Sequence, residues 1–275
     1  MRLIIIILAL LAIPKITKPQ SVSTLMGGRS SSLGNASSPI SDNWSLFNNV
    51  AGMAKIKSTS VNFAYAVNPS LPGADRAAAS INLPMPIGML GVGVFKFGDE
   101  LYSEQIFSAG YANQFGLASL GLKVNYVQYR AEGLGTHSAL SLNFGGIAEL
   151  TPKVSIGAYI VNINQPQLSS GTDESLPVIL VTGVQFHPQE ELILLLEIEK
   201  DLHYQPTIKG GIEYAFHEKV KARTGFNLNP NTIHGGIGYQ SARLIIDYAL
   251  QYNASIKTTY QLSTGYLLVK NKKQE

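Results

Sequence analysis

Apolar and polar residues alternate with a period of two from about residue 58 to residue 269, in segments of about 9–13 residues separated by turn residues. That period is typical of β-strands, and a strand that crosses a membrane needs about 9–11 residues. The pattern predicts fourteen strands, at 59–68, 76–85, 88–97, 103–114, 117–130, 137–150, 153–164, 177–187, 191–201, 206–216, 219–229, 232–240, 243–253 and 257–269.

The connections between these segments alternate in length. Tight turns are expected at 86–87, 115–116, 151–152, 188–189, 217–218 and 241–242, and longer loops at 69–75, 98–102, 131–136 and 165–176. Short turns on one side and longer loops on the other are typical of outer-membrane barrels. An even number of strands also puts both chain ends on the turn side.

Side chains within a segment sort by charge. In segment 191–201, Leu194, Leu196 and Ile198 share one face, whereas Glu197 and Glu199 share the other, because successive Cβ atoms point to opposite faces of a strand. We therefore expect an all-β, transmembrane, antiparallel up-and-down barrel with its apolar face toward lipid.

Eight charged residues are expected to face the enclosed bore. They either form a structural ladder of cross-strand pairs or line a path for a solute. They are Glu197, Glu199, Lys209, Glu213, Lys221, Arg223, Arg243 and Asp247.

A soluble β-sandwich would show the same alternation with its apolar faces turned inward. Three features favour the barrel. The segments are longer than the usual five or six residues, there are about fourteen of them, and the aromatic residues of the apolar faces lie near segment ends, as interfacial girdles require. Those aromatics are Phe107, Phe216, Tyr239, Tyr252 and Tyr260.

Composition narrows the class further. Only 14% of the 275 residues are charged, against about 25% in a typical soluble domain. The net charge of +3 gives no reason to expect a nucleic-acid partner. The chain has no cysteine, which excludes disulfides and cysteine-based zinc sites.

The first residues read as an export signal. Arg2 precedes an unbroken apolar run at 3–13, which Pro14 and Lys15 end, and this run is too short for a spanning helix. We expect a signal peptide at 1–20, cleaved near Gln20 or Ser21, and a mature protein in the outer membrane of a Gram-negative bacterium. An uncleaved N-terminal helix is the alternative. Residues 270–275 form a polar C-terminal tail.

No pattern of enzyme chemistry is present, so we expect neither catalysis nor a cofactor. The five histidines (His137, His187, His203, His217 and His234) lack metal-ligand spacing. The glycines at 27–34 are not followed by the Lys-Ser/Thr of a phosphate loop. No nucleophile-elbow motif occurs.

Residues 21–57 do not alternate and are expected to form an N-terminal plug, followed by the barrel at 58–269. Ser41 or Asp42 is suited to cap a short helix over 43–48, and Gly52 to end it. Arg29 is placed to reach a carboxylate of the bore.

This N-terminal segment resembles that of FadL-like outer-membrane proteins, nearest to the branch of PorV and PorQ, which is associated with type IX secretion. Val50 stands where that pattern usually has proline, and the stretches EIEKDLHYQPTIKGGIEY and FNLNPNTIHGGIGY also resemble this branch. The matching residues are Gly28, Arg29, Gly34, Ala36, Asp42, Phe47, Asn49, Ala51, Gly52 and Ala54.

The resemblance implies a fourteen-strand barrel whose N-terminal segment enters the bore. It favours an accessory or docking role in protein secretion or surface assembly, with secretion-machinery proteins or exported cargo as partners. One alternative is a FadL-like passive channel for a small hydrophobic solute, and another is a structural envelope barrel. In every case the surrounding partner is outer-membrane lipid.

Overall fold

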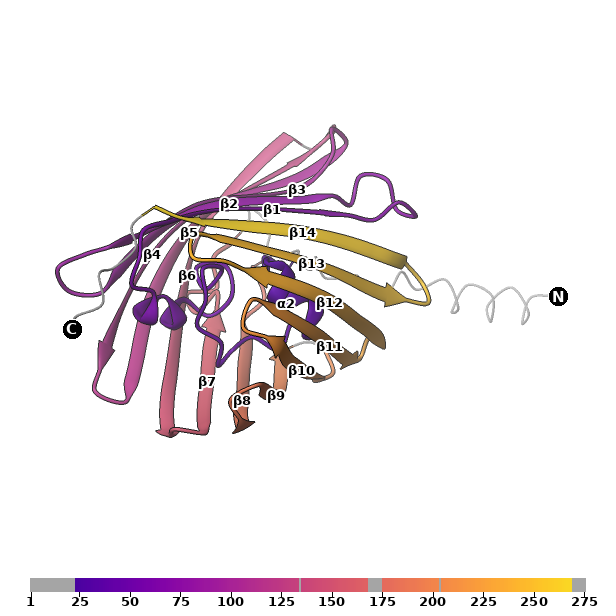
Figure 1. The fold of residues 1–275 in the computed structure, drawn as a ribbon. Helices are drawn as coiled ribbons and strands as arrows, with labels where there is room; N and C mark the ends of the chain where they lie inside the picture. Colours follow the sequence, from indigo (N-terminus) through magenta and orange to yellow (C-terminus); the bar gives the residue numbers. More distant parts are fainter. Residues whose placement is uncertain (1–22, 134, 168–174, 203, 269–275) are drawn as a thin grey trace, which may run out of the picture.

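The chain forms one closed antiparallel β-barrel in the computed structural model, which describes residues 23–133, 135–167, 175–202 and 204–268. Each strand pairs with the next in sequence, and β1 pairs with β14 to close the ring (Figure 1). The strands are β1 (Ser60–Val67), β2 (Arg76–Pro84), β3 (Met89–Gly98), β4 (Tyr102–Phe115), β5 (Ala118–Ala131), β6 (Gly135–Thr151), β7 (Val154–Val161), β8 (Ile179–Gln189), β9 (Leu192–Asp201), β10 (Thr207–His217), β11 (Val220–Leu228), β12 (Thr232–Gln240), β13 (Leu244–Asn253) and β14 (Lys257–Leu267).

The predicted fold class, a fourteen-strand up-and-down barrel, is confirmed. The expected signal peptide at 1–20, the first two residues of the expected plug and the tail at 270–275 lie outside the described residues.

Most strand boundaries lie within two residues of the prediction, and two of the differences have clear local causes. β7 ends at Val161 because Asn162 takes a positive φ of 57° and its N–H donates to the Asn143 side chain instead of continuing the ladder. β8 runs on to Gln189, through the expected turn, because an irregularity in its pairing with β9 between Phe186 and Gln189 absorbs the extra residues.

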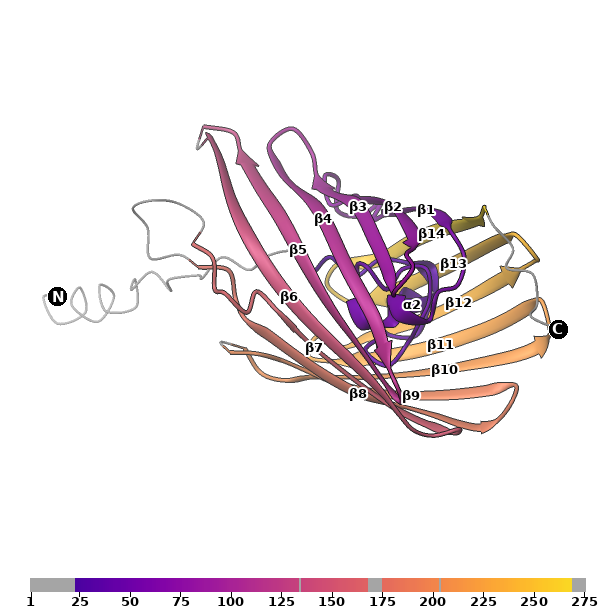
Figure 2. The same ribbon diagram turned by 90° about the vertical axis from the view of Figure 1, so that its left-hand side faces the viewer.

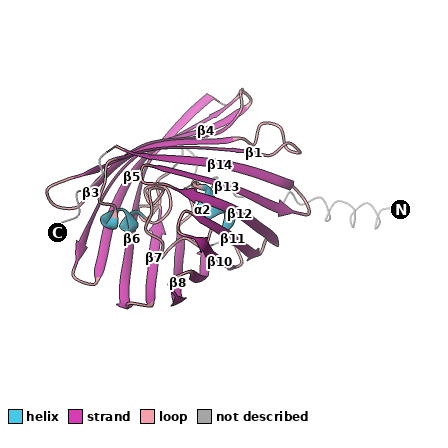
Figure 3. Cartoon of the chain, in the orientation of Figure 1, coloured by secondary structure: helices cyan, strands magenta, loops and turns pink. Residues whose placement is uncertain are grey.

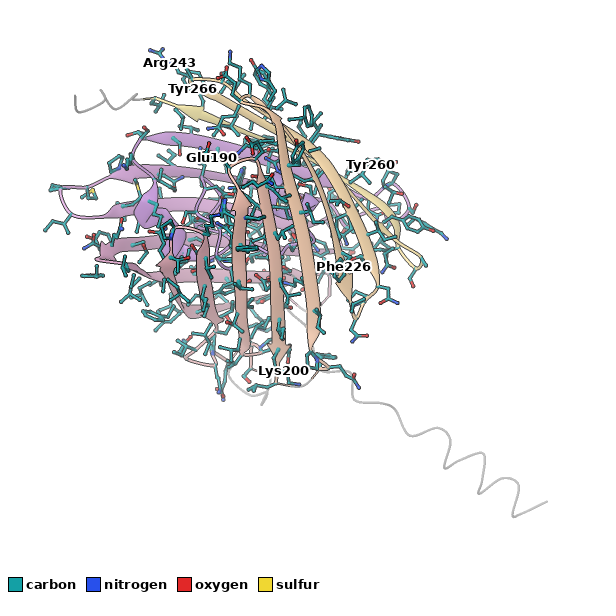
Figure 4. All side chains as sticks on the ribbon, turned by 60° about the horizontal axis from the view of Figure 1, so that its bottom comes forward. Glu190, Lys200, Phe226, Arg243, Tyr260 and Tyr266 are labelled. Carbon is teal, nitrogen blue, oxygen red and sulfur yellow. The ribbon has the colours of Figure 1, made fainter. Side chains whose placement is uncertain are left out.

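The outer surface of the barrel is apolar. Large side chains alternate outward along the strands, including Phe226, Tyr260 and Tyr266, whose exposed fractions are 44%, 38% and 44% (Figure 4). A continuous apolar exterior is stable only against hydrocarbon, so we treat the barrel as membrane-spanning. This orientation of the faces excludes the soluble sandwich. Among the described residues, no helix is long and apolar enough to cross a membrane.

The N-terminal segment from Ser23 to Ser58 lies inside the bore (Figure 2). It contains the short helix α2 (Gly28–Ser32) and the 3₁₀-helix η1 (Val50–Lys55), and the described part of the chain holds no other helix (Figure 3). α2 lies against β11–β14, whereas η1 lies against β3–β6. The segment therefore bridges opposite sides of the barrel.

The short helix predicted over 43–48 is wrong. That stretch forms turns, in which the Asp42 carboxylate accepts from the Trp44 N–H and the Asp42 carbonyl accepts from the Ser45 N–H. Such local side-chain bonds compete with helix formation. Gly52 lies within η1 and does not end a helix.

Glycines on the inner face of the barrel make room for this segment. A Cβ atom on Gly157 of β7 would overlap the Ser38 carbonyl, and one on Gly225 of β11 would overlap the backbone of Leu33 and Gly34. Gly34 itself has a φ of 70°, which favours glycine. The plug backbone thus rests directly on the backbone of the wall.

We predict that Gly157→Ala destabilises the plugged barrel by roughly 1–3 kcal/mol, the usual cost of overpacking. The measurement is the unfolding midpoint in detergent, followed by circular dichroism. Gly146→Ala is the matched control, because a Cβ there meets nothing closer than Leu120 Cδ2 at 3.5 Å. Equal shifts for both variants would show that the plug does not rest on Gly157.

Candidate functional site

The bore has an apolar wall on one side. Buried apolar side chains of β1–β6 form this wall, and Met26, Leu46, Phe47, Val50 and Met53 of the plug pack against it. We use "apolar wall" for the inward-facing residues Ala64, Ala78, Met89, Phe95, Ile106, Ala112, Val127 and Ala139.

The opposite side, from β9 to β13, is charged. Its centre is Glu213 of β10, whose side chain is 2% exposed and which contacts three cations. Arg29 of the plug donates to both carboxylate oxygens at 2.9 Å, Arg223 Nε donates at 2.6 Å, and Lys221 Nζ lies 3.5 Å away. Bidentate arginine–carboxylate pairs are among the stronger hydrogen bonds in proteins. Glu213 thus fixes the plug to the wall.

Two further carboxylates extend this cluster. Arg223 Nη1 contacts Asp247 of β13 at 2.6 Å, and Arg29 Nη1 lies 3.7 Å from Asp42 of the plug. Burial by itself lowers the pKa of Arg29, but the carboxylates of Glu213 and Asp42 outweigh burial and raise that pKa overall. Burial raises the pKa of Asp42, which Arg29 only partly offsets. Arg29 is therefore a permanent cation with one strong and one weaker anionic partner.

A second ionic anchor lies farther along the same wall, toward the loop side. Lys209 of β10 contacts Glu197 at 3.1 Å and Glu199 at 2.6 Å, and Glu197 also accepts from the Ser38 N–H of the plug at 2.7 Å. We call Glu197, Glu199, Lys209, Glu213, Lys221, Arg223 and Asp247 the charged wall. The plug is thus held by side-chain bonds at two points on it.

Seven of the eight residues expected in the bore come together in the charged wall, and Arg243 does not. β13 begins at Leu244, so Arg243 belongs to the preceding turn and its side chain is exposed at the end of the barrel (Figure 4). The period-two count was extended one residue too far at this strand end.

The N-terminal signature residues serve the docking of the plug. The Gly28 N–H donates to Ser263 Oγ at 2.8 Å, and Phe47 packs on the apolar wall. Asn49 Nδ2 donates to the carbonyls of Ser38 at 2.6 Å and Gly146 at 3.2 Å, while its Oδ1 accepts from the Ala51 N–H. A Cβ on Gly52 would overlap Ser45 and the Ile40 carbonyl. The signature residues are thus accounted for by their hydrogen bonds and their packing, with the barrel wall and within the plug.

Two residues that dock the plug, Ser38 and His234, and one buried lysine of the bore were missed from the sequence. Ser38 supplies a backbone N–H, which no side-chain pattern reveals. His234 of β12 contacts the Ser31 carbonyl through Nδ1 at 2.7 Å and Thr232 Oγ1 through Nε2 at 2.8 Å. Lys123 of β5 is 3% exposed. His234 and Lys123 both occupy inward positions of the alternation, so the period-two pattern held the signal for them.

Within the described residues, no group of three or more histidine, aspartate or glutamate side chains is arranged to hold a metal ion. The ionic clusters pair their carboxylates with cations and leave no set of ligands converging on one point.

Comparison with known proteins places the fold. No protein-family model and no curated protein matches the chain. Solved structures do. CymD, a monoaromatic hydrocarbon channel, superimposes with a TM-score of 0.73 at 13% identity over 91% of this chain and 99% of its own. The chain has the fold of FadL-like outer-membrane channels.

Two further structures of this FadL-like kind are similar. The toluene transporter TodX of Pseudomonas putida aligns at 11% identity and a TM-score of 0.66, covering 91% of this chain and 98% of its own. The toluene transporter TbuX of Ralstonia pickettii aligns at 12% and 0.65, covering 88% and 97%. All three of these proteins are channels or transporters. The resemblance of the N-terminal segment to the branch of PorV and PorQ is not tested by these structures and stays a prediction.

We predict that Glu213→Gln loosens the plug, because Arg29 and Arg223 lose the charge that they share. Removing one partner of a buried ion pair typically costs about 3–5 kcal/mol. Limited trypsin digestion in detergent, which reports cleavage after Arg29, measures the release.

Glu190→Gln is the matched control, since Glu190 is exposed in the turn between β8 and β9 (Figure 4). Cleavage rates for Glu213→Gln that equal those of the unmodified protein would contradict a role for Glu213 in holding the plug.

Proposed function

We propose that the protein is an outer-membrane channel for the passive entry of small hydrophobic solutes. The observation that carries this proposal is a row of inward-facing apolar residues in direct register across six strands. The row runs through Ala64, Ala78, Phe95, Ile106, Val127 and Ala139, each the pairing partner of the next.

This row packs against apolar side chains of the plug, and it is at the same time a continuous apolar surface inside the bore. Lumenal faces of membrane barrels are usually polar, and the charged wall shows that this chain builds a polar lumen where it uses one. Burial of an apolar solute on the row gains about 25 cal/mol for each Å² removed from water. The row therefore suits molecules that lack charge and hydrogen-bonding groups.

The plug is held unequally on its two sides, and this supports passage along the apolar wall. On the charged wall, Arg29 and Ser38 make directional bonds to Glu213 and Glu197. On the apolar wall, Met26, Leu46 and Phe47 make van der Waals contacts, which an apolar solute replaces without leaving a polar group unsatisfied. A solute thus displaces side chains of the plug while the charged side stays anchored.

The solute class rests on this chemistry and on the neighbours of similar fold. Those neighbours are a monoaromatic hydrocarbon channel and two toluene transporters. We accordingly place uncharged aromatic hydrocarbons among the candidate solutes.

Docking in protein secretion is the second candidate. It is supported by the N-terminal signature, by the plug that fills the bore, and by connections of only three residues after β3 and β5. The two roles differ in what a deletion strain loses. Lower accumulation of radiolabelled toluene with an unchanged set of secreted proteins supports the channel, whereas the opposite result supports docking.

We predict that Ala139→Gln lowers toluene accumulation roughly fivefold or more in cells of the deletion strain that express the variant. The reason is that an apolar solute in contact with the row would bury the newly introduced side-chain amide without a hydrogen-bond partner, which is unfavourable. Uptake is compared at equal amounts of protein in the outer membrane.

Ala254→Gln is the matched control, because Ala254 is exposed in the loop between β13 and β14. Unchanged accumulation with Ala139→Gln would show that solutes do not pass the apolar row.

A further inference from the structure

The outer face of β1–β6 carries a line of polar side chains near the loop end of the strands. Its members face outward, and each is the pairing partner of the next across neighbouring strands. Only the residue from β2 is not polar. The line, called the polar line below, consists of Tyr65, Ala77, Lys96, Gln105, Gln128 and Ser138.

Two residues nearer the turn end of each strand, the outward side chains are all apolar or aromatic. They too are in direct register, and they are Phe63, Ala79, Val94, Phe107, Tyr126 and Leu140. A charged side chain on the lipid face is costly at the middle of the membrane and tolerated near its surface. The edge of the hydrocarbon therefore runs between these two lines. Because loops of such barrels face outward from the cell, this is the edge of the outer leaflet.

A groove of about 310 Å³ crosses this edge on the outer face of β1–β4. Ala77 and Ala79 of β2 line it with small side chains, whereas Phe63 and Phe107 line it from the flanking strands β1 and β4. Lys96 lines it as well, together with its pairing partner Gln105. The groove thus has an apolar body within the hydrocarbon and a polar end at the level of the lipid headgroups.

Lys96 is available to an anionic partner. It forms no ion pair with any described residue. Glu104, next to Gln105 on β4, is fully buried on the inner face. The Asp75 carboxylate accepts from the Tyr65 hydroxyl, at the far end of the polar line. The acidic residues of the neighbouring loops line a separate cavity that Lys96 does not line, and they are Asp99, Glu100 and Glu132, together with Arg130.

We propose that this groove binds a phosphorylated lipid of the outer leaflet. A phosphate oxygen accepts from Lys96 Nζ and from the side-chain amide of Gln105, and one acyl chain lies over Ala77 and Ala79. The bond from the lysine is charge-assisted and therefore stronger than a neutral one. A chain in the groove also gains more van der Waals contacts than a chain on a smooth wall. The site lies outside the barrel and does not depend on the proposed channel function.

The test uses the full chain in a non-ionic detergent, with lipid A that carries both phosphates as the probe. Native mass spectrometry measures the fraction of protein that retains one lipid at increasing lipid concentration. We expect saturable binding of one lipid A molecule. The same lipid with its phosphates removed is expected to bind roughly 3- to 10-fold more weakly, because the bonds to the phosphate are lost.

Lys96→Gln tests the polar end of the groove and is expected to weaken the binding of lipid A roughly 3- to 10-fold. Lys200→Gln is the matched control. Lys200 lies at the loop end of β9 (Figure 4), where its Nζ donates to the Tyr204 carbonyl, and it does not line the groove. This control variant is expected to bind lipid A as the unmodified protein does.

Ala79→Leu tests the apolar body, because the larger side chain fills the space that the acyl chain occupies. A comparable loss of lipid A binding is expected. Ala109→Leu is the matched control, since Ala109 is exposed on the outer face of β4 and does not line the groove. Circular dichroism verifies that each variant keeps its strands.

Any of four results would overturn the proposal. They are the absence of saturable binding, equal binding of the phosphate-free lipid, tighter binding of phosphatidylglycerol than of lipid A, and losses in the two control variants as large as those in Lys96→Gln and Ala79→Leu. The third result would assign the groove to another membrane phospholipid. Solute uptake is not a readout of this experiment, so its failure leaves the proposed channel function untouched.

Discussion

The width of a fourteen-strand ring is the constraint on which the rest of the structure depends. Eight strands enclose a space that side chains alone fill, and wider barrels leave room inside. This chain fills that room with its own N-terminal segment, which must satisfy the inner wall in place of water. The inner surface of the barrel contacts the plug in three ways: through inward-facing glycines, through the apolar wall and through the charged wall. Each of these contacts a complementary part of the plug. Gly225 admits backbone, Phe95 meets apolar side chains, and Glu213 meets Arg29.

The apolar wall and the charged wall hold the plug by different kinds of contact. Ion pairs and charge-assisted hydrogen bonds are directional and fix position, whereas apolar contacts are not and tolerate exchange of partners. The plug therefore has one side that directional bonds hold in position and one side whose apolar contacts can be replaced by other apolar contacts. Under the proposed channel function, an apolar solute would replace contacts on the apolar side while the bonds to Glu213 and Glu197 keep the other side in place.

Much of this architecture was readable from the residues, because the period of a strand is local. The alternation predicted fourteen strands, the outward apolar face and the inward position of Glu213 and Asp247. It failed where local bonding overrides the period, as at Asn162, and where a strand simply starts one residue later, as at Arg243. The turns after Asp42 were mistaken for a helix, because a residue that caps helices also forms turns. Contacts through backbone atoms, such as the Ser38 N–H on Glu197, leave no trace in a side-chain pattern. The pairing of Arg29 with Glu213 in particular needed the closed ring, which alone brings the two positions together.

That pairing spans 184 positions of the chain, and the bond between the Gly28 N–H and Ser263 spans 235. Contacts between residues so distant in sequence close long loops, and the entropy of that closure opposes them until the fold stabilises them. Glu213 and Ser263 hold the plug from strands whose relative positions are set by the closed ring, in which β1 pairs with β14. The docking of the plug and the closure of the ring are therefore expected to stabilise each other.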